Sequence, residues 1–327
     1  EWAEIARKRF KCKAAAMNSH TTHVRWTAHN MPDIRGLHFV VTGGNAGLGY
    51  ETVRALASHG ATVTLACRTV AKGLAARDEI AARHGAVEID VRELDLASLT
   101  SVRDFAAALS TAPIDCLINN AGVMAPPLQR TADGFEMQFG TNHLGHFALT
   151  GHLWSGLMKS ESPRVVTLSS NAHKPGKIDF SNLNAEKKYS AWGAYAQSKL
   201  ANLLFAFELQ RRAAAHGQVA IKSIAAHPGY SATNLSLSVA PTMQGPLRDL
   251  SRRFERVIAQ SAEMGALPQL YAATAPEVPG AAYVGPDGWG EWRGYPRLVT
   301  PIAAARDESL AARLWKTSEE LTGVSWL

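Results

Sequence analysis

A glycine-rich turn between an expected strand and an expected helix constrains this chain more than any other feature. The run Thr42-Gly43-Gly44-Asn45-Ala46-Gly47-Leu48-Gly49 follows the apolar segment 39–41 and leads into an amphipathic stretch over 52–59. Strand, glycine turn and helix in this order build the pyrophosphate site of dinucleotide-binding α/β proteins. Glycine is needed because side chains would hold the phosphates away from the backbone N–H groups at the helix start. The motif alone leaves an ordinary glycine-rich turn as the alternative.

Apolar strand-like runs alternate with helical patterns from Leu37 onward, which predicts an α/β fold with a doubly wound parallel sheet of the Rossmann type. No internal repeat or break in composition follows residue 24, so we expect a single domain over 24–327. Residues 1–23 lack periodicity and are expected to form a flexible N-terminal extension; a basic membrane-surface or partner-binding arm is the alternative. We expect seven strands, near residues 39–41, 61–66, 87–94, 116–118, 164–168, 219–225 and 282–284.

The charge and the cysteines limit the function classes. The chain of 327 residues has 34 Lys plus Arg against 28 Asp plus Glu, a formal charge of +6. Several of the cations lie in residues 7–13 and the rest are scattered, so we do not expect nucleic-acid binding. No apolar run approaches the roughly 18–20 residues of a membrane span. The cysteines, Cys12, Cys67 and Cys116, form no C-x-x-C pair, which favours a reducing compartment and a cytoplasmic location.

The residue that ends the second expected strand indicates the cofactor. A Rossmann site for NAD usually has an acidic residue about 20 positions after the glycines, which holds the ribose 2′-OH. Here the strand ends in Arg68, 19 positions after Gly49. A guanidinium suits a 2′-phosphate, so we expect NADP(H) rather than NAD(H). The alternative is a solvated Arg at a strand end.

Tyr195 and Lys199 form a Y-x-x-x-K pair on an expected helix, where a spacing of four places both side chains on one face. A free tyrosine has a pKa near ~10 and is a poor acid or base at neutral pH. A neighbouring cation stabilises the phenolate and lowers that pKa, which makes the tyrosine a usable proton donor to a carbonyl oxygen. A tyrosine and a lysine at this spacing are common in proteins, so the motifs around them must decide whether the pair is catalytic.

Further motifs follow in a fixed order: Asn119-Asn120-Ala121-Gly122 after the fourth expected strand, Asn142 in a helical stretch, Ser169-Ser170 after the fifth, and Pro228-Gly229 through Thr233 after the sixth. With the glycine turn and Y-x-x-x-K, this set resembles the short-chain dehydrogenase/reductase superfamily over residues 34–285. The resemblance implies a catalytic set of Asn142, Ser170, Tyr195 and Lys199, with Ser169 as the rival serine. It implies that Asn142 holds a water in a proton relay toward Lys199. The cofactor contacts that it implies are Gly43, Asn45, Ala46, Gly47, Leu48, Gly49, Arg68, Asp95, Leu96, Asn120, Ala121, Gly122, Tyr195, Lys199, Pro228, Gly229 and Thr233.

The distance from Ser170 to Tyr195, 25 positions, is longer than the superfamily's usual dozen or so. The extra segment and Tyr195-Ala196-Gln197-Ser198-Lys199 resemble the branch of retinol dehydrogenases, WW-domain oxidoreductase and protochlorophyllide reductase. The resemblance implies an NADP(H)-dependent oxidoreductase that interconverts a carbonyl and an alcohol on a lipophilic substrate, and a homo-oligomer. The alternative function is a non-catalytic NADP(H)-binding redox sensor or scaffold.

Three other features each allow more than one interpretation. Residues 230–275 are rich in leucine and methionine, which fits a small helical lid over an apolar substrate or ordinary helix packing. His143 and His146 have the spacing of metal ligands, but no carboxylate or Cys completes a site, so we expect no metal. Trp289, Trp292 and Tyr295 lie in a Gly/Pro-rich loop, where they line a pocket mouth, form a subunit contact or pack on the domain.

Overall fold

One sheet of eight strands organises the part of the chain that the computed structural model describes, residues 25–109, 112–230 and 260–327. The strand order is β3-β2-β1-β4-β5-β6-β7-β8, with all neighbours parallel except β7 and β8. The order reverses between β1 and β4, so the sheet is doubly wound as predicted. The strands are β1 (His38–Thr42), β2 (Thr62–Cys67), β3 (Ile89–Glu93), β4 (Cys116–Asn119), β5 (Arg164–Leu168), β6 (Lys222–Ala226), β7 (Tyr283–Pro286) and β8 (Pro296–Leu298).

The eighth strand was not predicted. β8 pairs antiparallel with β7, with Val284 opposite Leu298, inside the segment that the sequence presents as a loop. Three residues that begin with a proline carry no detectable period-two pattern, so only the pairing with β7 defines this strand.

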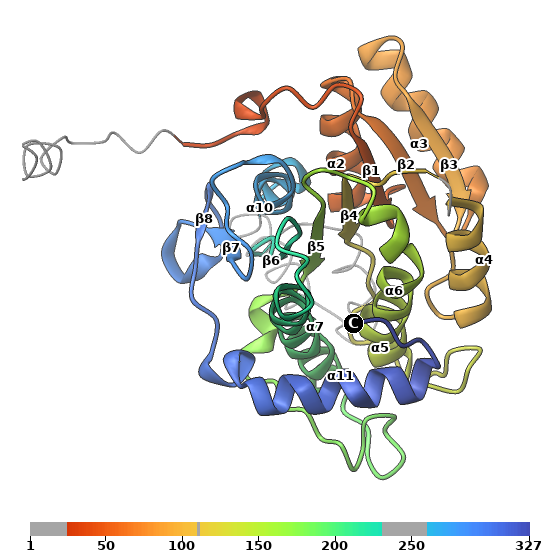
Figure 1. Cartoon of the computed structure of the whole chain (residues 1–327), viewed down its shortest axis with the longest axis vertical. Helices are drawn as coiled ribbons and strands as arrows, with labels where there is room; N and C mark the ends of the chain where they lie inside the picture. The colour runs from red at the N-terminus through yellow and green to blue at the C-terminus, as the bar shows by residue number, and fades with distance from the viewer. Residues whose placement is uncertain (1–24, 110–111, 231–259) are drawn as a thin grey trace, which may run out of the picture.

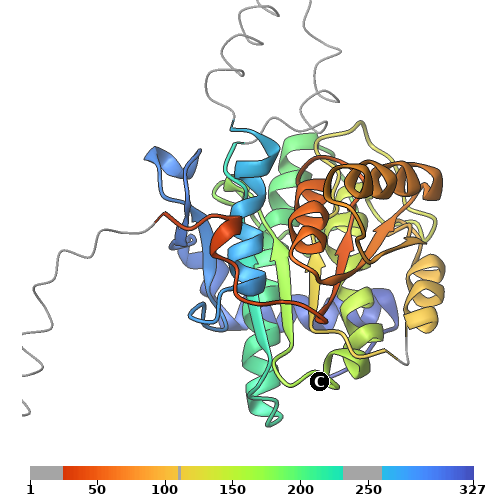
Figure 2. The same ribbon diagram turned by 90° about the horizontal axis from the view of Figure 1, so that it is seen from above.

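Helices cover both faces of the sheet (Figures 1 and 2). In Figure 1, α2 and α10 lie above the strands, and α6, α7 and α11 lie below them. The longer helices are α2 (Gly47–Ser58), α3 (Val70–His84), α4 (Leu99–Leu109), α6 (Gly145–Leu157), α7 (Ala191–Ala215), α10 (Ala262–Thr274) and α11 (Glu308–Thr322). The short ones are η1 (Ala28–Asn30), α5 (Met137–Phe139), η2 (Gly140–Leu144), η3 (Asn171–His173), η5 (Trp289–Glu291) and η6 (Ala303–Arg306).

The central strands bury side chains on both faces, which explains their continuous apolar runs. On one face Val41, Ile118 and Val166 join a core with α2, α3 and α10. On the other face Val40 and Leu117 pack with α4, α6 and α7. Because successive residues of a strand point to opposite faces, each strand serves both cores and cannot shift its register by one residue.

An aromatic cluster joins α6, α7 and α11. Trp315 of α11 is fully buried, stacks on Phe205 of α7 at 5.9 Å and meets Phe147 of α6 edge-on at 5.0 Å. Trp326 completes the cluster at 4.9 Å from Trp315. Aromatic pairs in these geometries stabilise beyond the burial of their area. Trp315 therefore fixes the C-terminal helix to the helix that carries Tyr195.

Several smaller features concern capping, the cysteines and helix length. Ser98 Oγ accepts a hydrogen bond from Ser101 N at the start of α4 and so caps this helix. Cys67 and Cys116 are buried and unpaired. Across the three described ranges, no helix is long and apolar enough to cross a membrane. The boundary after residue 23 and most of the predicted lid lie outside the described residues, so both stay predictions.

We expect Trp315→Ala to lower the free energy of unfolding by about 3–5 kcal/mol, because truncating a buried tryptophan leaves a cavity between two helices. The matched control is Trp289→Ala, whose side chain is 83% exposed; its effect should stay near ~0.5 kcal/mol. Urea unfolding followed by circular dichroism measures both. Equal losses in the two variants would show that the aromatic cluster does not hold α11.

Candidate active site

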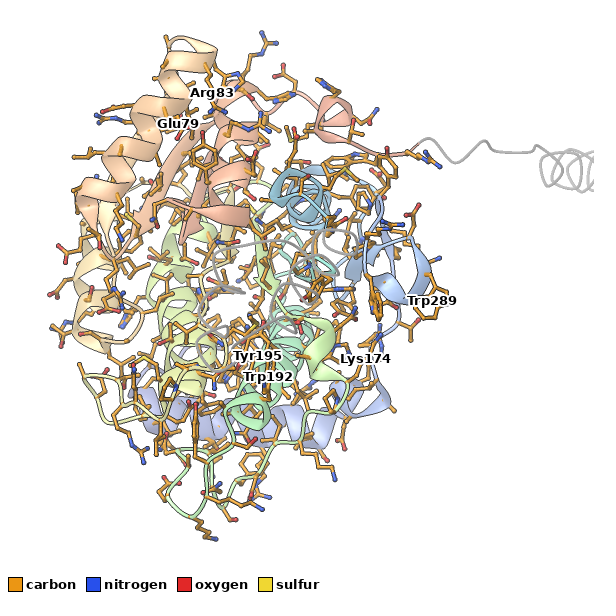
Figure 3. All side chains as sticks on the ribbon, turned by 180° about the vertical axis from the view of Figure 1, so that it is seen from behind. Glu79, Arg83, Lys174, Trp192, Tyr195 and Trp289 are labelled. Atoms are coloured by element: carbon orange, nitrogen blue, oxygen red, sulfur yellow. The ribbon has the colours of Figure 1, made fainter. Side chains whose placement is uncertain are left out.

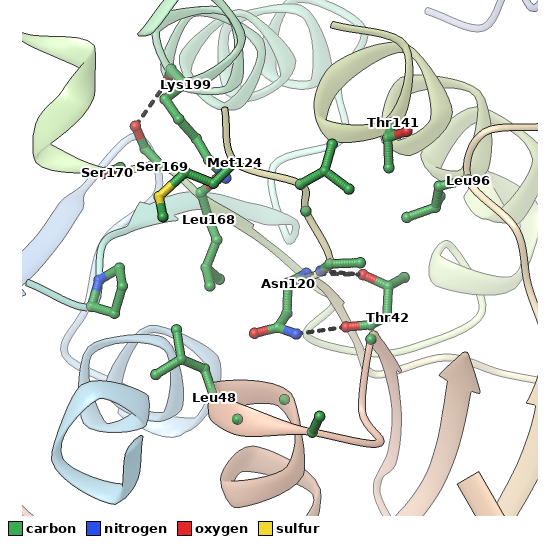
Figure 4. Close-up of a pocket in the computed structure, with 18 of the residues that line it drawn as sticks. Thr42, Leu48, Leu96, Asn120, Met124, Thr141, Leu168, Ser169, Ser170 and Lys199 are labelled. Carbon is green, nitrogen blue, oxygen red and sulfur yellow. Dashed lines mark hydrogen bonds between the residues drawn. The ribbon is translucent and has the colours of Figure 1, made fainter. Parts of the chain in front are cut away.

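A cavity of about 640 Å³ lies beyond the carboxyl ends of the central strands, where α/β proteins of this type bind ligands (Figure 4). Nearly all the predicted site residues line it. Asn142 does not, and Thr233 lies outside the described residues. The predicted residues that line the cavity are Gly43, Asn45, Ala46, Gly47, Leu48, Gly49, Arg68, Asp95, Leu96, Asn120, Ala121, Gly122, Ser170, Tyr195, Lys199, Pro228 and Gly229.

The glycine turn has the geometry that a dinucleotide diphosphate needs. Gly43 and Gly47 adopt left-handed backbone conformations, with φ of +67° and +54°. A Cβ on Gly49 would lie 2.2 Å from the carbonyl oxygen of Gly43, so the turn closes only without a side chain there. The turn leads directly into α2, whose first N–H groups and positive dipole end favour an anion.

Asn120 and Thr42 tie the glycine turn to the end of β4. Thr42 Oγ1 accepts hydrogen bonds from the backbone N–H groups of Asn120 and Ala121, both at 2.9 Å. Asn120 Nδ2 donates to the Thr42 carbonyl oxygen at 2.7 Å, as Figure 4 shows. The N-N-A-G segment therefore acts at this site through the position of its backbone as well as through its small side chains.

Arg68 is exposed at the end of β2 and lines the cavity together with Lys72 of α3. Within the described ranges, no carboxylate forms an ion pair with either residue. Two cations that are not paired with a carboxylate in this part of the chain can bind an anionic group.

Asp95 and Leu96 follow β3, the strand that neighbours β2 in the sheet, and both line the cavity. Asp95 Oδ1 accepts from the N–H of Ala97 at 3.0 Å and so folds its own loop. The carbonyl of Leu96 packs against α6: a Cβ on Gly145 would lie 2.4 Å from that oxygen. Glycine at 145 thus allows α6 to approach this wall of the cavity.

Tyr195 of α7 lines the cavity together with Ser170, which lies just after the end of β5. Burial raises the pKa of Tyr195 to about 12, while a hydrogen bond with Ser170 acts in the opposite direction. Ser169 Oγ instead donates to the Lys199 carbonyl oxygen at 2.8 Å and is buried (Figure 4). Of the two rival serines, the structure therefore places Ser170 against the tyrosine.

Lys199 lies one turn after Tyr195 on the same face of α7. Its Nζ donates to the Leu168 carbonyl oxygen at 3.3 Å and lies 5.6 Å from the centre of the Tyr195 ring. Burial lowers the pKa of Lys199 to about 8. Because Ser170 is the contact that lowers the pKa of Tyr195 here, the expected effect of Lys199 on the tyrosine stays a prediction.

Asn142 lies behind the cavity wall in η2, a π-helical turn. Its side chain is fully buried: Oδ1 accepts from Val123 N at 2.8 Å and Nδ2 donates to the Val123 carbonyl at 2.9 Å. Gly122 separates it from Lys199, because a Cβ at that glycine would lie 3.1 Å from Asn142 Oδ1 and 3.5 Å from Lys199 Nζ. Asn142 thus holds the backbone beside Lys199.

The two histidines near Asn142 serve the core. His146 Nδ1 donates to the Asn142 carbonyl oxygen at 3.0 Å, and its Nε2 lies 2.9 Å from Thr42 Oγ1. His143 Nε2 lies 2.9 Å from Ser318 Oγ of α11. Burial lowers the pKa of His143 to about 3 and that of His146 to about 4, so both are neutral. In the described part of the chain no cluster of His, Cys, Asp or Glu is arranged to hold a metal.

Sequence reasoning missed several cavity residues. Trp192 lies one turn before Tyr195 and meets its ring edge-on at 6.1 Å, as their adjacent positions in Figure 3 indicate. Helical spacing from Tyr195 was the available signal for Trp192. Trp292 lines the cavity, while Trp289 points to solvent and Tyr295 packs under Arg25, so the three aromatics of that loop have different roles. The other missed lining residues include Thr42, Lys72, Met124, Thr141, Leu168, Asn171 and Tyr230.

Known proteins resemble this chain over most of its length. The family model described as short chain dehydrogenase matches residues 38–244. Human retinol dehydrogenase 13 is 40% identical over 301 residues, which covers 89% of this chain and 86% of that protein. Human retinol dehydrogenase 12 is 41% identical, covering 88% and 86%. A crystal structure of an uncharacterized protein from Mycobacterium paratuberculosis is 45% identical with a TM-score of 0.77, covering 93% of this chain and all of that one.

We expect Gly49→Ala to weaken dinucleotide binding by about tenfold or more, since its Cβ would displace the Gly43 carbonyl and deform the turn. The control is Gly134→Ala: its φ of +87° adds backbone strain, but no atom lies within 4 Å of the new Cβ. Fluorescence titration with NADPH and NADH gives both affinities. Wild-type affinity in Gly49→Ala would show that the turn does not bind the diphosphate.

Proposed function

This chain belongs to the short chain dehydrogenase family, in the branch that contains the retinol dehydrogenases, and from that premise we propose that it is an NADP(H)-dependent oxidoreductase that interconverts a carbonyl and an alcohol. The observation that carries the proposal is the meeting of Tyr195, Ser170 and Lys199 on one wall of a cavity whose other wall is the glycine turn. A site that only bound the dinucleotide would not need a buried tyrosine beside a serine and a lysine.

The nicotinamide cofactor supplies or accepts the hydride when it is bound. In the reducing direction Tyr195 donates its proton to the substrate oxygen, and Ser170 hydrogen-bonds the same oxygen and holds it in place. Burial raises the pKa of Tyr195, so its hydroxyl is protonated before the reaction and can donate its proton. Lys199, whose pKa is lowered by its burial, takes part in returning the proton to Tyr195.

Asn142 supports the proton relay from behind the wall. Its side chain is fully engaged with Val123 and with Ser198, whose Oγ is 2.9 Å from Asn142 Nδ2. Its carbonyl oxygen accepts a hydrogen bond from His146 Nδ1. We therefore assign Asn142 to the placement of the Gly122–Val123 backbone and of a relay water near Lys199.

The proposed preference for NADP(H) rests on Arg68 and Lys72 and on the lack of a carboxylate partner for them among the described residues. The 2′-phosphate of NADP(H) would lie between the Arg68 guanidinium and the Lys72 ammonium. The guanidinium can form a bidentate pair of hydrogen bonds with the phosphate. Thr69, the N-cap residue of α3, also lines this end of the cavity. The start of α3 therefore adds a helix dipole of the right sign.

We assign a lipophilic substrate to the end of the cavity near Tyr195. Met124, Leu168, Trp192 and Trp292 present apolar surface there. Retinol dehydrogenases 12 and 13, the relatives named above, act by their names on an apolar alcohol. Reduction of small hydrophilic carbonyls alone would overturn this assignment.

The proposal also includes a cytoplasmic location and assembly into a homo-oligomer. The buried, unpaired Cys67 and Cys116 fit a reducing compartment such as the cytoplasm.

Arg68→Ala should weaken NADPH binding by about tenfold or more and leave NADH binding within about twofold, because only NADPH carries the phosphate that the guanidinium binds. Fluorescence titration measures both affinities. Arg83→Ala, which removes an exposed arginine of α3 from an ion pair with Glu79 far from the cavity, is the control (Figure 3). A wild type that prefers NADH would contradict the assignment of Arg68.

Tyr195→Phe should reduce turnover by about 10²-fold or more while NADPH affinity stays within about twofold, because the variant loses only the proton donor. Absorbance at 340 nm with a panel of lipophilic and hydrophilic aldehydes and ketones reports turnover. Tyr271→Phe on α10, where the ring packs on Trp26, is the matched control. Tight NADPH binding with no turnover by the wild type on any substrate would favour the redox sensor instead.

A further inference from the structure

A polar cluster beside the cavity has no part in the chemistry above. Its four residues, named here the Glu291 cluster, are Asn171, Lys174, His227 and Glu291. They come from three places: the turn after β5, the end of β6 and the connection between β7 and β8. Lys174 and Trp289, which belong to the first and third of these places, lie at the same edge of the molecule in Figure 3.

The central contact of the cluster joins a buried histidine to a carboxylate. His227 is fully buried, and its Nε2 lies 3.1 Å from Glu291 Oε2. Lys174 Nζ lies 3.7 Å from the same oxygen. Neither His227 Nε2 nor Glu291 Oε2 has a hydrogen-bond partner in the described structure, so their 3.1 Å approach is a close polar contact and not an aligned hydrogen bond. A proton on Nε2 places a donor toward the carboxylate, whereas an unprotonated Nε2 would face it with a second acceptor.

The other ring nitrogen fixes the same protonation state. The backbone N–H of Gly229 points at His227 Nδ1, 3.3 Å away, so this nitrogen must accept and carries no proton. Burial lowers the pKa of His227, and the contact with His227 lowers the pKa of Glu291. The pair is thus a neutral imidazole whose protonated Nε2 faces a carboxylate.

The backbone of Glu291 requires such support. Its φ is +59°, in the left-handed region that is unfavourable for residues with a side chain. Asn171 Nδ2 donates to the carbonyl oxygens of Gly290 and Glu291, at 3.3 and 3.2 Å. The side chain and the carbonyl of Glu291 are therefore both held from outside its own turn.

Residues of the Glu291 cluster are direct neighbours in the chain of residues that line the cavity. Trp292, which lines the cavity, follows Glu291 directly, and its carbonyl oxygen accepts from Tyr230 N at 2.7 Å. Asn171 follows Ser170 directly, so the same cluster fixes the turn that carries the proposed catalytic serine. A Cβ on Gly229 would lie 2.4 Å from the Trp292 carbonyl, which leaves little freedom between the two turns.

We propose that Glu291 is a positioning residue, which holds His227 in its Nε2-protonated form and joins the Ser170, Gly229 and Trp292 turns into one rigid substrate-side wall. The inference rests on the proposed carbonyl–alcohol activity for its kinetic consequences. Its structural core, the protonation state of His227, does not depend on turnover.

The test compares three variants of the full chain. Glu291→Leu keeps the bulk of the side chain and removes the acceptor; Glu291→Gln keeps an acceptor oxygen for His227; Glu320→Ala, on the outer face of α11, removes a carboxylate from an exposed pair and is the control. For each protein we would measure KM and kcat for a carbonyl substrate, the Kd for NADPH, and the ¹⁵N NMR signals of the histidine side chains at neutral pH, with His227 assigned from the signals lost in His227→Gln.

We expect wild-type His227 to carry its proton on Nε2. Glu291→Leu should raise KM about tenfold, with kcat and the NADPH Kd within about threefold, and should lose the single-tautomer His227 signal. Glu291→Gln should retain that signal and stay within about threefold of the wild-type KM. An unchanged KM and signal in Glu291→Leu, a parallel rise of KM and NADPH Kd, or a Gln variant as impaired as the Leu variant would each overturn the proposal.

Two outcomes need separate readouts. Should Glu291→Leu fail to fold, the wild type and Glu291→Gln decide, because a wild-type His227 protonated on Nδ1 overturns the proposal without any further variant. Should no protein turn over a carbonyl, the proposed function fails, whereas the His227 signals still show whether Glu291 sets the protonation state.

Discussion

The alignment of two strand ends by a single hydroxyl group underlies the rest of this site. Thr42 Oγ1 at the end of β1 accepts the N–H groups of Asn120 and Ala121 at the end of β4, and it also meets His146 of α6. These contacts close the switch point of the sheet, so the glycine turn and the N-N-A-G segment share one edge. Burial makes the contacts strong, because an unsatisfied group there would keep its full desolvation penalty.

The sequence was sufficient to predict those features that have both a local residue pattern and a clear chemical requirement. The parallel sheet, the glycine turn and the Tyr195–Lys199 pair follow from periodicity, φ requirements and helical spacing, and the structure has all three features. Asn142 was found by resemblance, but its place behind the wall depends on a π-helical turn that no local pattern indicates. β8 was missed because three residues beginning with proline show no strand periodicity.

Residues that act through distant partners were the hardest to predict. His227 and Glu291 are 64 positions apart, and neither position is unusual until the β6 and β7–β8 segments fold together. Ser169 and Ser170 are identical in type and adjacent, and only the packing of α7 against β5 separates a structural hydroxyl from one facing Tyr195. Tertiary burial, rather than composition, assigns these roles.

The two edge strands limit how copies of this protein can associate. β8 is three residues long, begins with Pro296 and carries Arg297, while β3 at the other edge exposes Asp90 beside Arg92. Short, charged or proline-bearing edges resist the addition of a strand from another chain. An assembly of this protein would therefore be built from helix surfaces and loops, and the sheet would end within each subunit.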